Sequence, residues 1–211
     1  MAKRSSVLRV VSKDELESAL AKGFSAPIEP LMGKPIACAD VRELAAAAHE
    51  QGVAAVCDLS LVGTACAAVR LGADVAFAPA MTAGEMLVWV ARGEQCVADA
   101  VRGLLSSGRD AGDGDIALLE QRARAWHVAS DAAQVVASYL VCHPRVESVA
   151  YPGLRSDSSY EIASRTLENG FGPLVDVRLV GEEGWRRITC ATDDSLTQVA
   201  RLEQRLREHM S

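Results

Sequence analysis

Short apolar runs alternate with amphipathic segments along the first half of the chain. Residues 7–11, 53–58 and 74–79 are apolar almost throughout, which is typical of strands buried on both faces of a sheet. Residues 41–51 and 64–71 lie between these runs and favour helices. Because helices between buried strands build βαβ units, this order predicts an α/β fold with a partial parallel sheet and helices on both of its faces.

Polar residues at the starts of the helices support these bounds. Ser12 and Glu15 have the spacing of a capping box, which predicts a short helix directly after the first strand. Asp40 is predicted to cap the helix at 41–51. Residues 85–92 are predicted as one more strand of the same sheet.

A segment rich in glycine and aspartate, residues 106–115, interrupts this pattern. Asp115 is predicted to cap a long helix over 116–142, and we place the domain boundary there. We therefore expect an abridged large domain over 1–112 and a smaller C-terminal α+β domain over 113–211. The remaining predicted elements are helices at 94–107, about 158–169 and 195–209, and strands at 146–150, 174–180 and 185–190.

Composition and charge narrow the classes of function. The chain has 211 residues, of which 49% are hydrophobic, and its net charge of −6 with scattered arginines disfavours nucleic acid as a partner. The chain contains neither a secretory signal pattern nor an apolar run long enough to cross a membrane, so we expect a cytoplasmic protein without a membrane partner. The six cysteines lack metal-binding spacing, which predicts buried free thiols and no metal site.

Three segments together resemble one family of enzymes that use pyridoxal phosphate (PLP). The strongest is VASYLVCHPRVESVAYPGLRSDSSYEIASR at 136–165, and the other two are SAPIEPLMGKPIACADVRELAAAAHEQGVAAVCDLSL at 25–61 and RRITCATDDSLTQVARLEQRL at 186–206. They are similar, in the right order, to segments of the cystathionine γ-synthase and methionine γ-lyase family of cysteine and methionine metabolism. The resemblance implies an abridged PLP-transferase-like scaffold.

This sequence differs from the family at the residues that would carry out the chemistry. The resemblance implies a Ser-Ala-Thr-Lys segment after Gly-Ala-Asp, whose lysine forms the Schiff base with PLP, but Pro79, Ala80, Met81 and Thr82 stand there. Thr82 has no amine, so no catalytic residue is expected at the family lysine position. All four lysines precede residue 58 in the chain, and none is expected near this loop. The substitutions at Pro79 and Met81 also remove hydroxyls that would help to hold the phosphate.

Two other positions match residues with a role in the family. Asp58 matches the carboxylate that pairs with the ring nitrogen of PLP, and its alternative role is that of a strand-end acid that caps the next turn. Arg187 matches the arginine that grips the substrate carboxylate, and its alternative is a charge at an exposed strand edge. Glu29 stands where the family has an asparagine beside the ring hydroxyl, which disfavours the cofactor.

The first part of the family's large domain, with its phosphate-binding helix terminus, is expected to have no counterpart here. We therefore predict a degenerate, non-catalytic relative of transsulfuration-type PLP enzymes, for which PLP is implied by the family but not expected to bind. One alternative is a subunit of a PLP-dependent lyase or transferase for cysteine- or homocysteine-type amino acids, completed by another chain. Others are an oligomerisation module, as a homodimer or paired with a full-length relative, and a binder of a small amino acid through Arg187.

Overall fold

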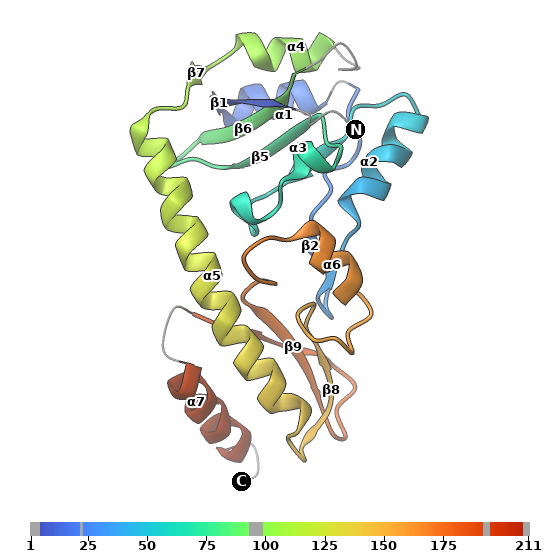
Figure 1. Cartoon of the computed structure of the whole chain (residues 1–211), viewed down its shortest axis with the longest axis vertical. Coiled ribbons are helices and arrows are strands. Elements are labelled where there is room, and N and C mark those ends of the chain that lie inside the picture. Colours follow the sequence, from blue (N-terminus) through green and yellow to red (C-terminus); the bar gives the residue numbers. More distant parts are fainter. Residues whose placement is uncertain (1–4, 22, 93–98, 192–194, 209–211) are drawn as a thin grey trace. The chain divides into compact units, whose positions relative to one another are not determined.

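A computed structural model describes residues 5–21, 23–92, 99–191 and 195–208 of the chain (Figure 1). The chain divides into two units, each with its own core. Unit 1 contains residues 1–30 and 39–123, and unit 2 contains residues 31–38 and 124–211. The predicted division into 1–112 and 113–211 differs from this one because a long helix runs through the boundary and residues 31–38 join unit 2.

Unit 1 is built on a five-stranded sheet. In sheet order its strands are β4 (Val56–Asp58), β5 (Val75–Pro79), β6 (Glu85–Ala91), β1 (Ser6–Ser12) and β7 (Arg109–Asp110). Only β4 and β5 are parallel among these strands, whereas the other neighbouring pairs run antiparallel. The predicted partial parallel sheet is present as the β4–β5 pair, and β6 runs antiparallel to β5 because residues 80–84 are too few for a crossover and close a hairpin instead (Figure 1).

The helices of unit 1 confirm most of the predicted starts. The capping box of Ser12 and Glu15 opens α1 (Lys13–Leu20), and Asp40 caps α2 (Val41–Glu50). The helix predicted at 64–71 is interrupted, since its residues form a 3₁₀ turn η1 (Gly63–Ala65) and a short α3 (Ala68–Leu71) with Cys66 extended between them. The unit is completed by α4 (Asp99–Ser106) and by the first part of α5 (Asp113–Val141).

The alternation of side chains along the strands gives unit 1 two apolar layers. One face of the sheet buries Val56, Val75 and Val88 against Leu16 of α1 and Leu104 of α4. A second cluster consists of Val10, Ala80, Leu87 and Leu119, so the start of α5 packs on that side. Both faces of the sheet are therefore covered, as predicted.

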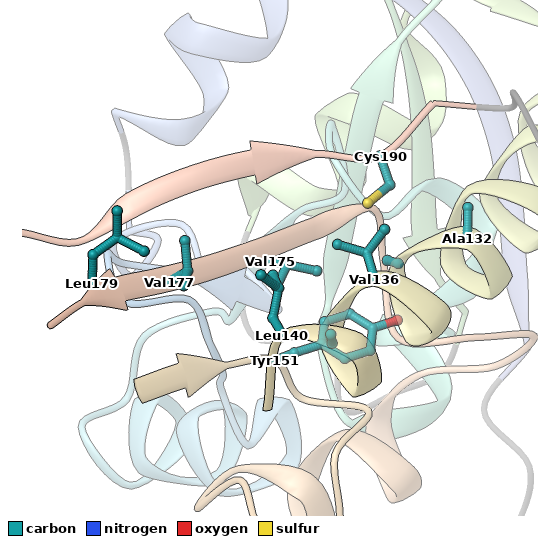
Figure 2. Close-up of a cluster of buried hydrophobic side chains, with 10 residues drawn as sticks. Ala132, Val136, Leu140, Tyr151, Val175, Val177, Leu179 and Cys190 are labelled. Carbon is teal, nitrogen blue, oxygen red and sulfur yellow. The ribbon is translucent and has the colours of Figure 1, made fainter. Parts of the chain in front are cut away.

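Unit 2 combines a small antiparallel sheet with helices. Its strands are, in sheet order, β10 (Arg186–Thr189), β9 (Leu174–Leu179) and β8 (Val146–Ala150), beside a short pair of β2 (Leu31–Met32) and β3 (Ala37–Cys38). Its other helices are α6 (Tyr160–Thr166) and α7 (Ser195–Glu208). Ala133, Val136, Ala137 and Leu140 have helical i, i+3, i+4, i+7 spacing on α5 and belong to one buried cluster with Tyr151 and strand β9 (Figure 2).

The described helices include none with the length and apolar character that a bilayer crossing requires.

Candidate functional site

The loop at 80–84 follows β5, and it is where the resemblance implies the family's Schiff-base lysine. It is a tight turn, because the Ala80 N–H donates to the Glu85 carbonyl and the Glu85 N–H donates to the Thr82 carbonyl. Thr82 is exposed at the tip, and the Met81 side chain is 68% exposed. The loop therefore presents a hydroxyl and a thioether to solvent, and neither group can form an aldimine.

Contacts from three directions fix this loop. Arg122 of α5 donates from Nη1 to the Pro79 carbonyl, and the backbone N–H of Lys13 donates to the Gly84 carbonyl over 2.8 Å. On the β6 side, Arg109 binds both Glu85 (3.2 Å) and Asp115 (2.6 Å). These contacts tie the hairpin to α1, β7 and α5.

Asp115 is the buried member of that network and does not occupy the predicted N-cap position. Helix α5 begins at Asp113, so Asp115 is its third residue and accepts a hydrogen bond from the Gly112 N–H over 3.0 Å. The ion pair with Arg109, and then this backbone hydrogen bond, lower the pKa of Asp115. The prediction that Asp115 is the N-cap was wrong, because the helix begins at Asp113 rather than at 116 as predicted, and the Asp115 side chain reaches back to the Gly112 N–H, as the third residue of a capping box does.

Lys13 corrects the expectation that no lysine lies near the loop. Strand β1 ends beside β6, with Ser12 opposite Glu85, and this places the first turn of α1 against Gly84. The Lys13 ammonium lies 3.6 Å from Glu17, one turn further along the helix, and both side chains are 62% exposed. The sequence resemblance could not reveal this proximity, because the proximity comes from strand pairing across more than seventy residues of sequence.

Asp58 lies at the end of β4 and makes the contact expected of a strand-end acid. Its Oδ1 accepts a hydrogen bond from the Ser60 N–H over 2.8 Å, which closes a local turn. The segment before Glu29 lies beside it, since Ile28 bridges to Cys57 and the Asp58 N–H donates to the Ile28 carbonyl. Glu29 itself is exposed. Two acidic residues therefore follow neighbouring backbone segments, at positions where the resemblance implies one acid and one amide.

Arg187 belongs to unit 2, where its guanidinium is already held by a carboxylate. Its Nε donates to Asp176 Oδ1 over 2.9 Å and its Nη2 to Oδ2 over 2.7 Å, and Nη2 also donates to the Gly33 carbonyl. Asp176 is fully buried, and this ion pair raises the pKa of Arg187. Sequence reasoning missed Asp176, although it lies opposite Arg187 in the register of β9 and β10.

His49 and Asp74 form a second buried contact that the sequence did not reveal. The His49 Nε2 lies 2.7 Å from Asp74 Oδ2, and the same oxygen accepts the Ala55 N–H over 2.8 Å. Asp74 is the acid of the Gly-Ala-Asp segment and is almost fully buried. It joins α2, the start of β4 and the start of β5, so its role is structural. Within the described ranges, no three histidine, cysteine or acidic side chains gather as metal ligands.

Comparison with known proteins shows which proteins this chain resembles in sequence. Residues 119–200 match the model of the family described as Cys/Met metabolism PLP-dependent enzyme. Cystathionine gamma-synthase of Mycobacterium tuberculosis is 50% identical over 50 residues, which are 24% of this chain and 13% of that protein. Homocysteine synthase of Schizosaccharomyces pombe is 45% identical over 40 residues, or 19% of this chain and 9% of that protein.

Solved structures extend the likeness of fold over most of the chain. An apo methionine gamma lyase from Micromonospora echinospora gives a TM-score of 0.63 at 18% identity over 92% of this chain and 67% of its own. A putative O-acetylhomoserine (thiol)-lyase from Campylobacter jejuni, which contains a pyridoxyl-lysine, gives 0.65 at 16% identity over 90% of this chain and 67% of its own. The predicted resemblance to the Cys/Met metabolism family of PLP-dependent enzymes is confirmed by the family model over residues 119–200 and by the local sequence matches, and the solved structures share the fold. The sequence matches themselves cover only about an eighth of the cystathionine gamma-synthase.

Proposed function

We propose that this chain is a non-catalytic member of the family that does not hold PLP as an aldimine. The observation that carries the proposal is the loop at 80–84, where the exposed Thr82 stands at the family lysine position. An aldimine needs a primary amine that can lose its proton and attack the cofactor aldehyde. No residue from Pro79 to Gly84 supplies one.

The surroundings of the loop support the same conclusion. The Asp58 carboxylate is engaged by the Ser60 N–H, and the exposed Glu29 adds a negative charge where the family has an amide. Lys13 is close to the loop through its backbone, but its ammonium lies 3.6 Å from Glu17, one turn further along α1. The residues present therefore do not fit a covalently bound PLP.

The ion pair of Arg187 and Asp176 argues against capture of an amino-acid substrate. In the family this arginine grips the substrate carboxylate, whereas here both arms of the fork meet Asp176. A free carboxylate would have to displace a buried internal one that also accepts the Ile36 N–H over 2.6 Å. The Asp176 carboxylate thus uses the guanidinium donors that a substrate carboxylate would need.

Borohydride trapping tests the absence of an aldimine. Purified protein mixed with PLP is expected to show no saturable aldimine absorption band, and after reduction with borohydride, peptide mapping should find no stoichiometric label at one lysine. The matched variant Lys13→Arg keeps a cation beside Glu17 but removes the amine of the lysine whose backbone contacts the loop, so it should behave like the wild type. A saturable band that disappears in Lys13→Arg, or turnover of cysteine, methionine or homoserine derivatives by the isolated chain, would contradict the proposal.

A second candidate function is assembly, as a homodimer or with a full-length relative. Met81 is 68% exposed and Ile116 is 43% exposed, and the Met81 Cε lies close to Gly114 at the start of α5. Exposed apolar side chains near one another in this way favour a contact with a partner. The surface formed by Met81, Gly114 and Ile116 is therefore the contact that we assign to a partner.

Sedimentation velocity distinguishes this candidate from a monomer. We expect concentration-dependent association that Met81→Asp weakens at least tenfold in dissociation constant, because a buried unpaired charge is costly. Val180→Asp, at an exposed apolar position of unit 2, is the control and should associate like the wild type. A chain that stays monomeric at all concentrations and ignores a full-length relative would rule out assembly. Turnover that arises only in the mixture would favour a PLP-dependent subunit completed by another chain.

A further inference from the structure

A cavity of about 320 Å³ lies beside strands β5 and β6, and the described residues that line it all belong to unit 1. Its wall includes Ala76 of β5 and Trp89 of β6, which lie opposite each other in the strand register and therefore share one face of the sheet. The small Ala76 side chain leaves space beside the larger indole. Pockets for small ligands have volumes from about 300 to 1,000 Å³, so this cavity suits a ligand of one or two rings.

The connection from β4 to β5 leaves this face of the sheet partly open. It consists of the 3₁₀ turn η1, the extended Cys66 and the four residues of α3, instead of one continuous helix. Leu59, Cys66 and Val69 of this connection line the cavity and are at most 6% exposed, while Trp89 is half-buried. This part of the wall is therefore apolar and shielded from solvent.

Polar side chains line another part of the wall. Arg70 of α3, Thr64 of η1 and Ser6 at the start of β1 are exposed residues that contribute to it. Among the lining residues that the structure describes, Arg70 alone is charged and none is acidic. A guanidinium binds a carboxylate through charge-assisted hydrogen bonds, and hydroxyl groups can add further donors. The wall therefore favours an anion over a cation.

We propose that this cavity is a binding site for a small aromatic carboxylate, whose ring lies against Trp89 and Ala76 and whose carboxylate binds Arg70. The ring gains from burial against the apolar wall and from contact with the indole. One guanidinium balances one negative charge, whereas an ammonium group would be buried without an acidic partner from the described wall. Aromatic amines and zwitterionic amino acids should therefore be poor ligands.

This inference does not rest on the proposed absence of PLP. Asp58, Thr82 and Arg187 are not among the described residues that line the cavity. Leu59 and Thr64 do line it, and both belong to the segment that follows β4. A bound ligand would therefore hold this segment in place, and because it binds only the folded chain it would also stabilise the fold.

Phenylacetate and phenethylamine test the proposal as a matched pair, because they carry the same ring and opposite charges. The readout is the indole N–H resonance of Trp89 in the isotopically labelled full chain, identified by its loss in Trp89→Phe. We expect phenylacetate to shift this resonance saturably, while the indole resonances of Trp126 and Trp185, both in unit 2, stay unchanged. Phenethylamine and phenylalanine should leave all three resonances unchanged.

Variants of the wall test the two parts of the site separately. Arg70→Gln removes the charge and should raise the dissociation constant of phenylacetate at least about tenfold. Arg42→Gln is the matched control, since Arg42 is an exposed arginine of α2 outside the described wall, and it should bind phenylacetate like the wild type. Ala76→Leu should fill the space beside Trp89 and abolish the shift.

The proposal would be overturned if the Trp89 resonance showed no saturable shift up to about 10 mM phenylacetate, a weak limit for a ligand of this size. Equal effects of phenylacetate and phenethylamine, equal shifts at Trp126 or Trp185, or unchanged affinity in Arg70→Gln would also overturn it. Circular dichroism checks that each variant is folded, and the comparison of the two probes on the wild type decides the question if a variant is not.

Discussion

Asp176→Ala is expected to lower the free energy of unfolding by about 3–5 kcal/mol, the usual cost of removing one partner of a buried ion pair. Asp176 is fully buried and accepts three hydrogen bonds, from Arg187 Nε and Nη2 and from the Ile36 N–H. Its removal leaves the guanidinium and a buried backbone donor without this acceptor. Urea unfolding of the full chain measures the loss, and hydrogen exchange of peptides from β9 and β10 shows whether it is local to unit 2.

An exposed ion pair of Arg186, the residue next to Arg187 on β10, provides the matched control. Arg186 binds Glu182 over 2.6 Å, and the two side chains are 43% and 38% exposed. Because solvent screens such a pair, Glu182→Ala should cost no more than about 1 kcal/mol. Equal losses in the two variants would mean that Asp176 does not hold Arg187 in solution, and the argument that its guanidinium is unavailable to a substrate would fail with it.

Local signals in the sequence predicted the elements of this fold well. The capping box of Ser12 and Glu15 and the cap at Asp40 depend only on residues within one helical turn, and both are present. The long helix α5 and strands β8, β9 and β10 also follow from apolar periodicity within each segment. These features need no knowledge of which strand pairs with which.

The errors arose where pairing between distant segments decides the structure. Strand direction in the sheet of unit 1 depends on the hairpin at 80–84 and on the pairing of β1 with β6, neither of which periodicity reports. The same pairing brings Lys13 to the loop. The register of β9 and β10 likewise places Asp176 opposite Arg187. The resemblance pointed to Arg187 as a candidate, but only the register shows that the Asp176 carboxylate binds its guanidinium.

The candidate site consists of positions that the resemblance pointed to, and each of them has a local partner. Asp58 binds its own turn, Arg187 binds Asp176, and Thr82 lies at the tip of a hairpin that Arg122 and Arg109 hold in place. Each partner is supplied by this chain. Because these polar groups are satisfied within the chain, they need no ligand to remain paired, which supports the proposal of a non-catalytic role.

The segment with the strongest family resemblance, at the YPGL turn, also has a structural role here. Tyr151 is completely buried in the core of unit 2, and its hydroxyl lies 3.1 Å from the Ser130 carbonyl and 3.2 Å from the Gly172 carbonyl (Figure 2). Burial raises the pKa of Tyr151, so the hydroxyl remains a donor. A Cβ on Gly153 would lie 2.5 Å from the Tyr151 ring, so glycine is required for this close approach.

Tyr151→Ala should therefore cost about 3–5 kcal/mol of unfolding free energy, because it leaves a cavity in the cluster that joins α5 to β9. Tyr151→Phe keeps the ring and loses only the hydroxyl, so it should cost about 1 kcal/mol. Tyr160→Phe is the control, since that ring is half-buried beside Phe171, and a change within about 0.5 kcal/mol is expected. Urea unfolding of the three variants measures these differences. If Tyr151→Ala were as mild as Tyr160→Phe, packing would not explain the turn, and the resemblance at this segment would have to reflect chemistry at its surface instead.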